Sequence, residues 1–359
     1  MFRAQSEIHR ILVRGTNWVG DSVMTIPALR ALRRRFAEAE ITLMVRPWVS
    51  DLFIGASFID RVLLYDKNGP HKGLRGLGCA VSMVRTKRFD MAILFQNALE
   101  AALIVHLAGI PQRVGYATDG RGWLLTHKAG FAPALRGRHQ IYYYLGILSG
   151  SGLVESPPWL AANFTPDISL AVTDEELKRV DILLGELGVD PSKRLVGLNP
   201  GAYFGPAKRW TSDRYAALAD CMIRDAHAEI VIFGSAGERR IAEEISSQMH
   251  YQPKSLAGRT TLRDLMAVLR RCRLLITNDS GPMHLAAALN VPQLAIFGST
   301  DPGATGPYST NATVIQHAVS CSPCLLRECP IDLRCFTSIS VEEVYAAARR
   351  KLDTSRPVL

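Results

Sequence analysis

The sequence predicts an α/β fold made of two doubly wound domains, each a parallel sheet that is covered by helices on both faces. Short apolar runs alternate with helical patterns along all 359 residues, which is the rhythm of repeated β–α–β units. That length favours two domains over one. A Pro-rich stretch without a period, ESPPWLAANFTPDISL (155–170), separates two such series. We therefore expect domains at 1–160 and 161–340, and a C-terminal helix at 341–359 that packs back toward the first domain.

The first series contains four expected strands and one strongly patterned helix. The helix, SVMTIPALRALRRRFA (22–37), has apolar residues at helical spacing and a basic outer face. The most apolar window, 91–110, includes Gln96, Asn97, Glu100 and His106, which argues against a membrane span. The strands are expected at IHRILVRG (8–15), ITLMVRP (41–47), RVLLYDK (61–67) and DMAILFQ (90–96).

The second series has the same organisation. Ser340 followed by Glu343 predicts a capping box at the start of the last helix. Two doubly wound domains that face each other would place the carboxyl ends of their strands, and hence a ligand, in the cleft between them. The strands are expected at RLVGLNPG (194–201), AEIVIFGS (228–235), CRLLITND (272–279) and VPQLAIFG (291–298), and the helices at SDRYAALADCMIRDA (212–226), TLRDLMAVLRRC (261–272) and SVEEVYAAARRKLD (340–353).

The positive charge of the chain is concentrated in its first part. The formal net charge is +9, and residues 1–160 contain 20 of the 42 Lys and Arg but only 11 of the 33 Asp and Glu. The remaining 22 basic and 22 acidic residues cancel. Such an excess is either a well-solvated surface or a face that attracts an anionic partner. The polar start MFRAQSEIHR does not predict a secretory signal, and seven cysteines without one indicate a cytoplasmic protein.

The loop NPGAYFGPAKRW (199–210) places two cations directly after a tight bend. Folding does not require Lys208 and Arg209 at this point. Lys208 can neutralise a phosphate as a point charge, whereas we expect Arg209 to be a solvated neighbour. Trp210 is expected in the core. The loop therefore predicts an anion-binding site centred on Lys208.

A second candidate site lies in ITNDSGPMHLAAAL, where an apolar strand ends in Asn278-Asp279 and a helix follows. Ser280 and Gly281 start that helix, with a proline near its first turn. Backbone N–H groups and the positive end of the helix dipole favour phosphate there without a metal. His284, in the first turn, is either a packed histidine or a residue that supports the anion site.

Two carboxylates follow expected strands elsewhere. Asp21 in RGTNWVGDSVMTIP comes after Gly15 and Gly20, whose spacing is not the dinucleotide-binding G-x-G-x-x-G. Asp21 is either a first-turn carboxylate that stabilises its helix or a general base at the edge of a cleft. Glu238, after VIFGSAG, lies where a doubly wound strand end would present an acid to a ribose; the alternative is an exposed glutamate at a helix start.

Four cysteines form a cluster near the C-terminus, with the spacing C-x2-C-x4-C-x5-C. Four thiols within 15 residues predict either a structural zinc or iron–sulfur site, or reduced thiols that pack a loop before the last helix. The cluster consists of Cys321, Cys324, Cys329 and Cys335. The other three, Cys79, Cys221 and Cys272, are expected to be small core residues.

Several motifs together resemble the lipopolysaccharide heptosyltransferases of glycosyltransferase family 9, and the heptosyltransferase II branch in particular. The resemblance implies a GT-B fold of two Rossmann-like domains facing across a cleft. It also implies inverting transfer of heptose from ADP-L-glycero-β-D-manno-heptose to a heptose of the lipopolysaccharide inner core, with no cofactor required. The motifs are GTNWVGDSVMTIPALRALR, GIPQRVGY, NPGAYFGPAKRW, VIFGSAGE, LAGRTTL and TNDSGPMHLAAALNVPQLAIFGSTDP.

The same resemblance implies a role for each candidate residue. The expected partners are the ADP-heptose donor, a heptosyl-Kdo-lipid A acceptor and the inner-membrane surface, with peripheral attachment and no nucleic acid. The arginines expected to contact the acceptor are Arg113, Arg121 and Arg138. The other implied roles are general base for Asp21, diphosphate binding for Lys208, Ser280 and Gly281 with support from His284, heptose binding for Asp279, ribose binding for Glu238, and adenine binding for Gly258 and Thr260.

Three other functions remain open from the sequence. One is a family 9 transferase that acts on a different core acceptor. Another is a nucleotide-sugar epimerase of the same fold, which would need acid and base groups around the donor sugar in place of an acceptor channel. The third is a metal-cluster protein that binds nucleic acid through its basic part, although no recognised nucleic-acid motif supports it.

Overall fold

The computed structural model describes residues 2, 4–161 and 163–354, and it divides into two compact units. Unit 1 is Met1–Ile168 and unit 2 is Ser169–Leu359. Each unit contains one six-stranded sheet whose strand pairs are all parallel. The expected α/β class with two doubly wound sheets is therefore confirmed.

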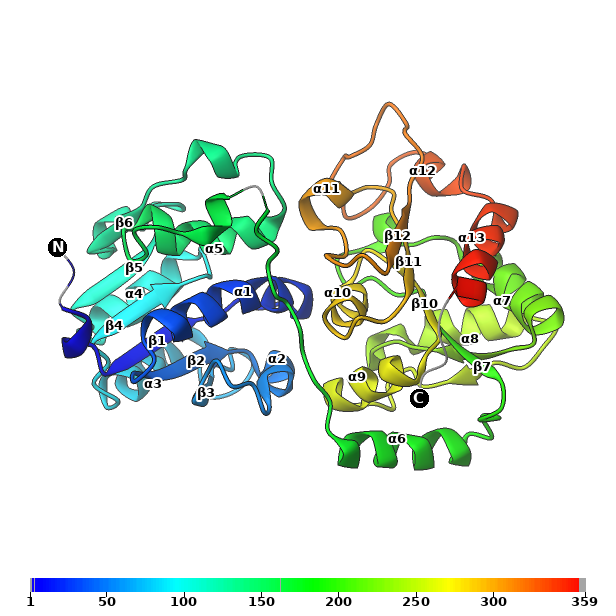
Figure 1. Cartoon of the computed structure of the whole chain (residues 1–359), viewed down its shortest axis with the longest axis horizontal. Helices are drawn as coiled ribbons and strands as arrows, with labels where there is room; N and C mark the ends of the chain where they lie inside the picture. The colour runs from blue at the N-terminus through cyan, green and yellow to red at the C-terminus, as the bar shows by residue number, and fades with distance from the viewer. Residues whose placement is uncertain (1, 3, 162, 355–359) are drawn as a thin grey trace. The chain divides into compact units, whose positions relative to one another are not determined.

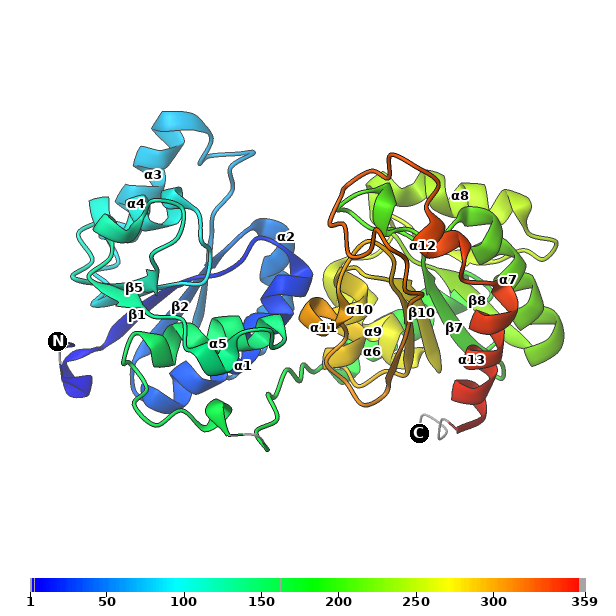
Figure 2. The ribbon, with the colours of Figure 1, turned by 90° about the horizontal axis from the view of Figure 1, so that it is seen from above.

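Unit 1 has the strand order β3-β2-β1-β4-β5-β6. In Figure 2 the helices α3 and α4 lie on one face of this sheet and α1 and α5 on the other. The strands are β1 (Arg10–Arg14), β2 (Glu40–Val45), β3 (Arg61–Leu64), β4 (Met91–Leu94), β5 (Gln112–Tyr116) and β6 (His127–Ala129). The helices are α1 (Val19–Arg35), α2 (Pro47–Ser50), α3 (Gly73–Arg85), α4 (Leu99–Leu107) and α5 (Gln140–Gly150).

Unit 2 has the strand order β12-β11-β10-β7-β8-β9. Its helices also cover both faces, with α7, α8 and α13 on one side and α9 and α10 on the other (Figures 1 and 2). The strands are β7 (Arg194–Asn199), β8 (Ala228–Ile232), β9 (Lys254–Ser255), β10 (Leu274–Asn278), β11 (Gln293–Ile296) and β12 (Ala312–Ile315). The helices are α6 (Asp174–Glu186), α7 (Ser212–Ala226), α8 (Arg239–Gln248), α9 (Leu262–Arg271), α10 (Gly281–Ala288), α11 (Pro302–Thr305), α12 (Arg334–Thr337) and α13 (Val341–Thr354).

The central strands of both sheets are buried because helices cover them. In β1 and β4 every residue except Arg10 is buried, and β10 is buried throughout, as expected for parallel strands covered on both faces. The last helix, α13, belongs to this scheme. Its residues Val344, Ala347, Ala348 and Leu352 join the hydrophobic core of unit 2. The apolar face of this helix is thus part of the core of unit 2. Its expected packing toward the first domain stays a prediction.

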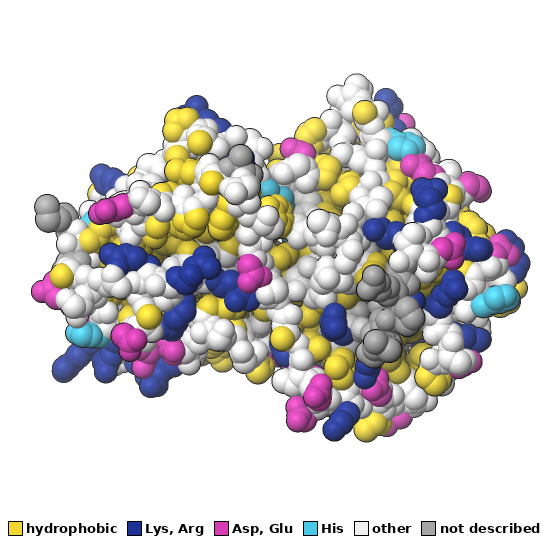
Figure 3. Space-filling model, in the orientation of Figure 1, with side chains coloured by type: hydrophobic (Ala, Val, Ile, Leu, Met, Phe, Trp, Pro, Cys, Tyr) yellow, Lys and Arg dark blue, Asp and Glu magenta, His cyan; other side chains and the backbone are white. Residues whose placement is uncertain are grey.

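The apolar window 91–110 is divided between β4 and α4. Among the described residues, no helix combines the length and the apolar character that crossing a lipid bilayer requires. The basic side chains of unit 1 do not form one continuous patch on the face drawn in Figure 3, where Lys and Arg lie in several separate groups.

Candidate active site

The reversal of strand order in each sheet determines where a ligand site can form. In unit 2 the chain runs outward from β7 through β8 to β9 and then returns to β10 on the other side of β7. The loops after β7 and β10 therefore diverge at the carboxyl edge of the sheet, which is the usual ligand position in open α/β sheets. These two loops carry Lys208 and Asp279.

Lys208 and Asp279 meet directly at this point. The Lys208 Nζ atom lies 2.6 Å from Asp279 Oδ2. The same carboxylate oxygen accepts a hydrogen bond of 2.7 Å from the hydroxyl of Thr300, which follows β11. The Asp279 side chain is buried, with 6% exposed, and that of Lys208 is 17% exposed. Three loops that follow three neighbouring strands therefore hold one ammonium group in a defined position.

Two buried asparagines link the β7 and β10 loops. Asn278, which is fully buried, donates from Nδ2 to the carbonyl of Pro200 at 2.7 Å and accepts from the backbone N–H of Trp210 at 3.1 Å. Asn199 donates to the Ser280 hydroxyl at 2.8 Å. These bonds join both ends of the Lys208 loop to the end of β10 and to Ser280, just after it. Trp210 is 2% exposed, so its expected core position is confirmed.

The start of α10 lies beside this pair. Ser280 is its N-cap residue, and the Ser280 side chain makes no capping hydrogen bond. Pro282 has no N–H and the Met283 N–H donates to the Ser280 carbonyl at 3.2 Å, so the N–H groups of Ser280 and Gly281 are the candidates for binding an anion here. Uncapped amides and the helix dipole favour an anion at such a point. His284 is buried within the same first turn, at 6% exposed. A phosphate site at this helix start, on the residue that follows the Lys208 partner Asp279, is compatible with this arrangement and stays a prediction.

Glu238, the acid expected to bind ribose, follows β8, the strand next to β7. Glu238 Oε2 accepts from the backbone N–H and the hydroxyl of Ser235 at 2.8 and 2.7 Å, so this carboxylate caps a short 3-10 turn. The carboxylate also lies against Gly201, where a Cβ atom would come within 2.1 Å of Glu238 Oε1. Glu238 is half-buried and caps this turn, so the alternative of an exposed glutamate at a helix start is only partly correct. Its contact with a ribose stays a prediction.

The two residues expected to bind adenine lie beyond β9. Gly258 has φ +68°, and a Cβ atom there would come within 2.8 Å of Ala236 Cα. Both its left-handed conformation and this close approach require glycine. Thr260 precedes the N-cap residue of α9. The donor residues taken from the sequence therefore all lie in the loops or the first helical turns that follow β7, β8, β9 and β10 of one sheet.

Asp21 occupies the corresponding position in unit 1. The strand order reverses between β1 and β4, and Asp21 lies in the first turn of α1, directly after the β1 loop. The Tyr144 hydroxyl donates a long hydrogen bond of 3.4 Å to Asp21 Oδ1. Burial and the charge of Asp21 raise the pKa of Tyr144 well above its usual value, so this hydroxyl stays protonated and orients the carboxylate.

The loop before Asp21 is tightly held. A Cβ atom at Gly15 would come within 2.7 Å of Val45 Cγ1, so β1 and β2 leave room only for glycine. The indole N–H of Trp48 donates to the carbonyl of Asn17 at 2.8 Å, and Thr16 and Ser22 share a hydrogen bond of 2.8 Å. These bonds fix the entry into α1 and with it the position of Asp21.

Sequence comparison decides the family of this protein, whose two sites each lie where the strand order of a sheet reverses (the switch point of that sheet). The model of glycosyltransferase family 9 (heptosyltransferase) matches residues 81–334, well over half of the chain. The chain belongs to glycosyltransferase family 9. It is 30% identical over 322 residues to lipopolysaccharide heptosyltransferase 2 of Salmonella typhimurium, which covers 86% of this chain and 88% of that protein.

Solved structures of family 9 proteins resemble the whole chain. The structure of Escherichia coli ADP-heptose lipopolysaccharide heptosyltransferase II is 27% identical, with a TM-score of 0.80, and covers 96% of this chain and 98% of its own. The family 9 glycosyl transferase from Veillonella parvula is 25% identical, with a TM-score of 0.84, and covers 99% of both chains. The chain is therefore a glycosyltransferase. Its two domains, each built on a parallel sheet, belong to the GT-B class.

The three arginines expected to contact the acceptor serve the folding of this family 9 chain. Arg121 is fully buried, and the guanidinium of Arg138 lies 3.5 Å from the centre of the Tyr142 ring. All three donate to main-chain carbonyls within unit 1: Arg113 to Ile110 and Leu124, Arg121 to Tyr116 and Gln96, and Arg138 to Trp159. Their contact with an acceptor remains a prediction.

The cysteines give a mixed result. Cys272 is buried as expected, Cys221 is half-buried, and Cys79 is exposed on α3, so its expected core position is wrong. Burial and the neighbouring thiols raise the pKa of Cys335. In the part of the chain that the structure describes, no three His, Cys, Asp or Glu side chains are arranged to hold a metal ion. A structural metal at the C-terminal cysteines remains a prediction.

Two residues of the site were not identified from the sequence. Asn199 ends β7, and Thr300 follows β11 in the sequence FGST. Both are polar residues at or just after the end of an apolar strand, the same signal that identified Asp279. Applying that rule to all strands of unit 2 would have found them.

Proposed function

We propose that this protein transfers heptose from ADP-L-glycero-β-D-manno-heptose to a heptose of the lipopolysaccharide inner core, with inversion at the anomeric carbon. The observation that carries the proposal is the contact of Lys208 with Asp279 beside the start of α10. A cation beside the N–H groups of Ser280 and Gly281 at the positive end of a helix suits a diphosphate, and the carboxylate suits sugar hydroxyls. The names of the family 9 relatives support the heptose and the lipopolysaccharide.

The chemistry follows from the charges that develop during transfer. The acceptor oxygen attacks the anomeric carbon and its proton passes to Asp21, while the bond between that carbon and the diphosphate breaks and ADP leaves with the electron pair. Negative charge therefore grows on the diphosphate. Lys208 and the α10 amides stabilise this charge, because donors that are already oriented need no rearrangement during the reaction. Inversion requires the base to act from the face opposite the leaving group.

Before the donor binds, Asp279 holds the ammonium group of Lys208 in place. A diphosphate offers that ammonium stronger negative charge, and we assign Asp279 to the heptose hydroxyls once Lys208 has turned to the phosphate. Glu238 is assigned to the ribose, and Gly258 and Thr260 to the adenine. Asp279 therefore acts in both states.

The acceptor and the location follow from the same assignment. The acceptor, heptosyl-Kdo-lipid A, is rich in phosphate and carboxylate groups and lies in the inner membrane. The excess of Lys and Arg in residues 1–160 suits peripheral contact with such an anionic surface from the cytoplasmic side.

A transfer assay with defined, truncated core acceptors and mass analysis of the products tests the function. We expect one heptose to be added to an acceptor that carries a single heptose, and the donor to be stable when no acceptor is present. Conversion of the donor into another sugar nucleotide without acceptor would indicate an epimerase. Addition to an acceptor that lacks heptose, or only to one that already carries two, would indicate a different family 9 specificity.

The proposed stabilisation of the leaving group needs no divalent metal. We expect transfer to continue at an unchanged rate in excess EDTA, because Lys208 and the α10 amides supply the positive charge. A requirement for added magnesium would contradict this. Metal analysis of the EDTA-treated protein tests the structural cluster separately, since a metal enclosed by Cys321, Cys324, Cys329 and Cys335 would be retained while transfer continued.

A further inference from the structure

The cysteine-rich segment 321–335 is bonded to the loop that carries Lys208. The carbonyl of Arg327 accepts from the backbone N–H of Ala207 at 3.1 Å, and Arg327 Nε donates to the carbonyl of Phe204 at 2.8 Å. Gly205, between these two points, has no room for a side chain, since a Cβ atom there would lie 2.3 Å from the Arg327 carbonyl oxygen. Arg327 thus contacts the loop on both sides of Gly205, immediately before Lys208.

The same arginine shares an aromatic ring with Lys208. The Arg327 guanidinium lies 5.7 Å from the centre of the Phe204 ring, and Lys208 Nζ lies 5.2 Å from it. Cations are attracted to the face of an aromatic ring at such distances. The ring therefore connects the position of the Lys208 ammonium to that of Arg327.

Segment 321–335 is in turn anchored to the other half of the site. The backbone N–H of Leu325 donates to the carbonyl of Ser299 at 2.9 Å, and the Ser322 hydroxyl donates to the carbonyl of Gly298 at 2.5 Å. Thr300, the next residue in that loop, is the hydroxyl donor to Asp279. Both partners of the Lys208–Asp279 pair are therefore held by loops that this segment contacts.

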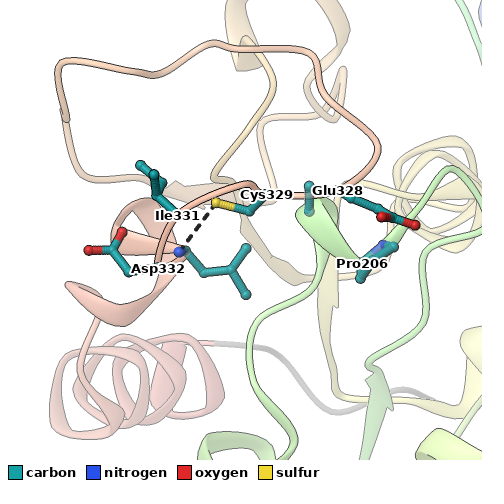
Figure 4. A pocket seen from close by; sticks show the side chains of 7 residues that line it. Pro206, Glu328, Cys329, Ile331 and Asp332 are labelled. Carbon is teal, nitrogen blue, oxygen red and sulfur yellow. Dashed lines mark hydrogen bonds between the residues drawn. The ribbon is translucent and has the colours of Figure 1, made fainter.

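Beyond Arg327 the segment moves away from the loop and leaves a pocket of about 470 Å³. A local hydrogen bond closes the turn at residues 329–333 of this segment: the backbone N–H of Leu333 donates to Cys329 Sγ at 3.4 Å. Figure 4 shows Pro206 and Glu328 close together at one end of this pocket, and Cys329, Ile331 and Asp332 toward the other end. Within the described part of segment 321–335, the hydrogen bonds to residues 204–208 come from Arg327.

We propose that Arg327 is a positioning residue for the donor site: it fixes the loop 204–208 and thereby the ammonium of Lys208 against the diphosphate of the donor. The proposal rests on the function assigned above to Lys208. In this proposal Arg327 acts through the loop and not through contact with the donor or the acceptor. Its side chain is exposed, so the loss of this side chain should change the site without unfolding unit 2.

The test compares Arg327→Ala and Arg327→Lys with a matched control, Arg334→Ala. Arg334 lies in the same segment and is also exposed, but its side chain bonds to Asp332, two residues away. We expect Arg327→Ala to raise the Kd for ADP and the KM for the donor about tenfold, because small displacements of a positioned group are costly. The KM for the acceptor should be unchanged. Arg327→Lys keeps a cation near Phe204 and should recover part of the loss.

A double-mutant cycle decides whether the effect passes through Lys208. If it does, adding Arg327→Ala to Lys208→Ala should change ADP binding by less than about twofold. An equal loss in both backgrounds, or an equal loss in Arg334→Ala, would overturn the positioning role. So would wild-type kinetics of Arg327→Ala, and the proposed function would then stand as long as Lys208→Ala is impaired. If Lys208→Ala binds ADP normally, the donor site itself is wrongly assigned.

Discussion

Replacing Asp21 with Asn lowers kcat by about 10²- to 10⁴-fold, the usual contribution of a general base, and leaves the Kd for ADP nearly unchanged. Asparagine has the size of aspartate and can still accept the hydrogen bond from Tyr144, so the fold of the β1–α1 loop should be preserved. It cannot take the proton of the acceptor hydroxyl. Steady-state transfer kinetics together with calorimetric titration of ADP measure the two quantities.

A carboxylate in the first turn of a helix also stabilises that helix, and this effect needs its own control. Asp174→Asn removes an exposed carboxylate from the first turn of α6, at a place with no switch point. Both substitutions should lower the free energy of unfolding by a similar amount, within about 1 kcal/mol, but only the change at Asp21 should stop transfer. Full activity of Asp21→Asn would show that another group takes the proton.

The central strands could be predicted because burial on both faces leaves an uninterrupted apolar run. Strands β1, β4, β7 and β10 all lie within predicted ranges. The strands β6, β9 and β12 were not specified, because they lie at the sheet edges and are short or carry exposed residues, such as Lys128 in β6. Strand β5 was not specified either, because Gln112, Arg113 and Gly115 interrupt its apolar run. Such segments are determined by the partner strand, which a local pattern does not contain.

The site could be predicted only where its signal is local. Lys208, Asp279 and Asp21 each follow a strand within one motif. The bonds that position them join residues far apart in the sequence, for example Asn278 with Pro200, and no local pattern reveals these pairs. The same limit explains why the contact of the Glu343 carboxylate with a distant residue was not predicted. The backbone N–H of Glu343 bonds to the Ser340 hydroxyl as predicted, but its carboxylate lies 3.0 Å from His317 Nε2.

Lys208→Ala lowers kcat/KM for the donor by about 10²- to 10³-fold, the effect of removing one oriented donor from a developing negative charge, and weakens ADP binding. Lys178→Ala on α6 removes an exposed lysine from the same unit and should have no effect on either quantity. The comparison uses initial rates at varied donor concentration and direct ADP titration. Unchanged values for both in Lys208→Ala would place the diphosphate elsewhere.

Loss of Lys208 also leaves the buried carboxylate of Asp279 without its cation, which on its own destabilises the fold. A second change separates the two effects, because Asp279→Asn in the Lys208→Ala background removes the uncompensated charge. We expect the double variant to regain much of the Tm that Lys208→Ala loses, since the asparagine can still accept from the Thr300 hydroxyl. Donor binding should not recover, because the cation is still missing. If ADP affinity and Tm recovered together, the loss in Lys208→Ala would reflect a disordered loop, and the lysine would have no direct part in holding the diphosphate.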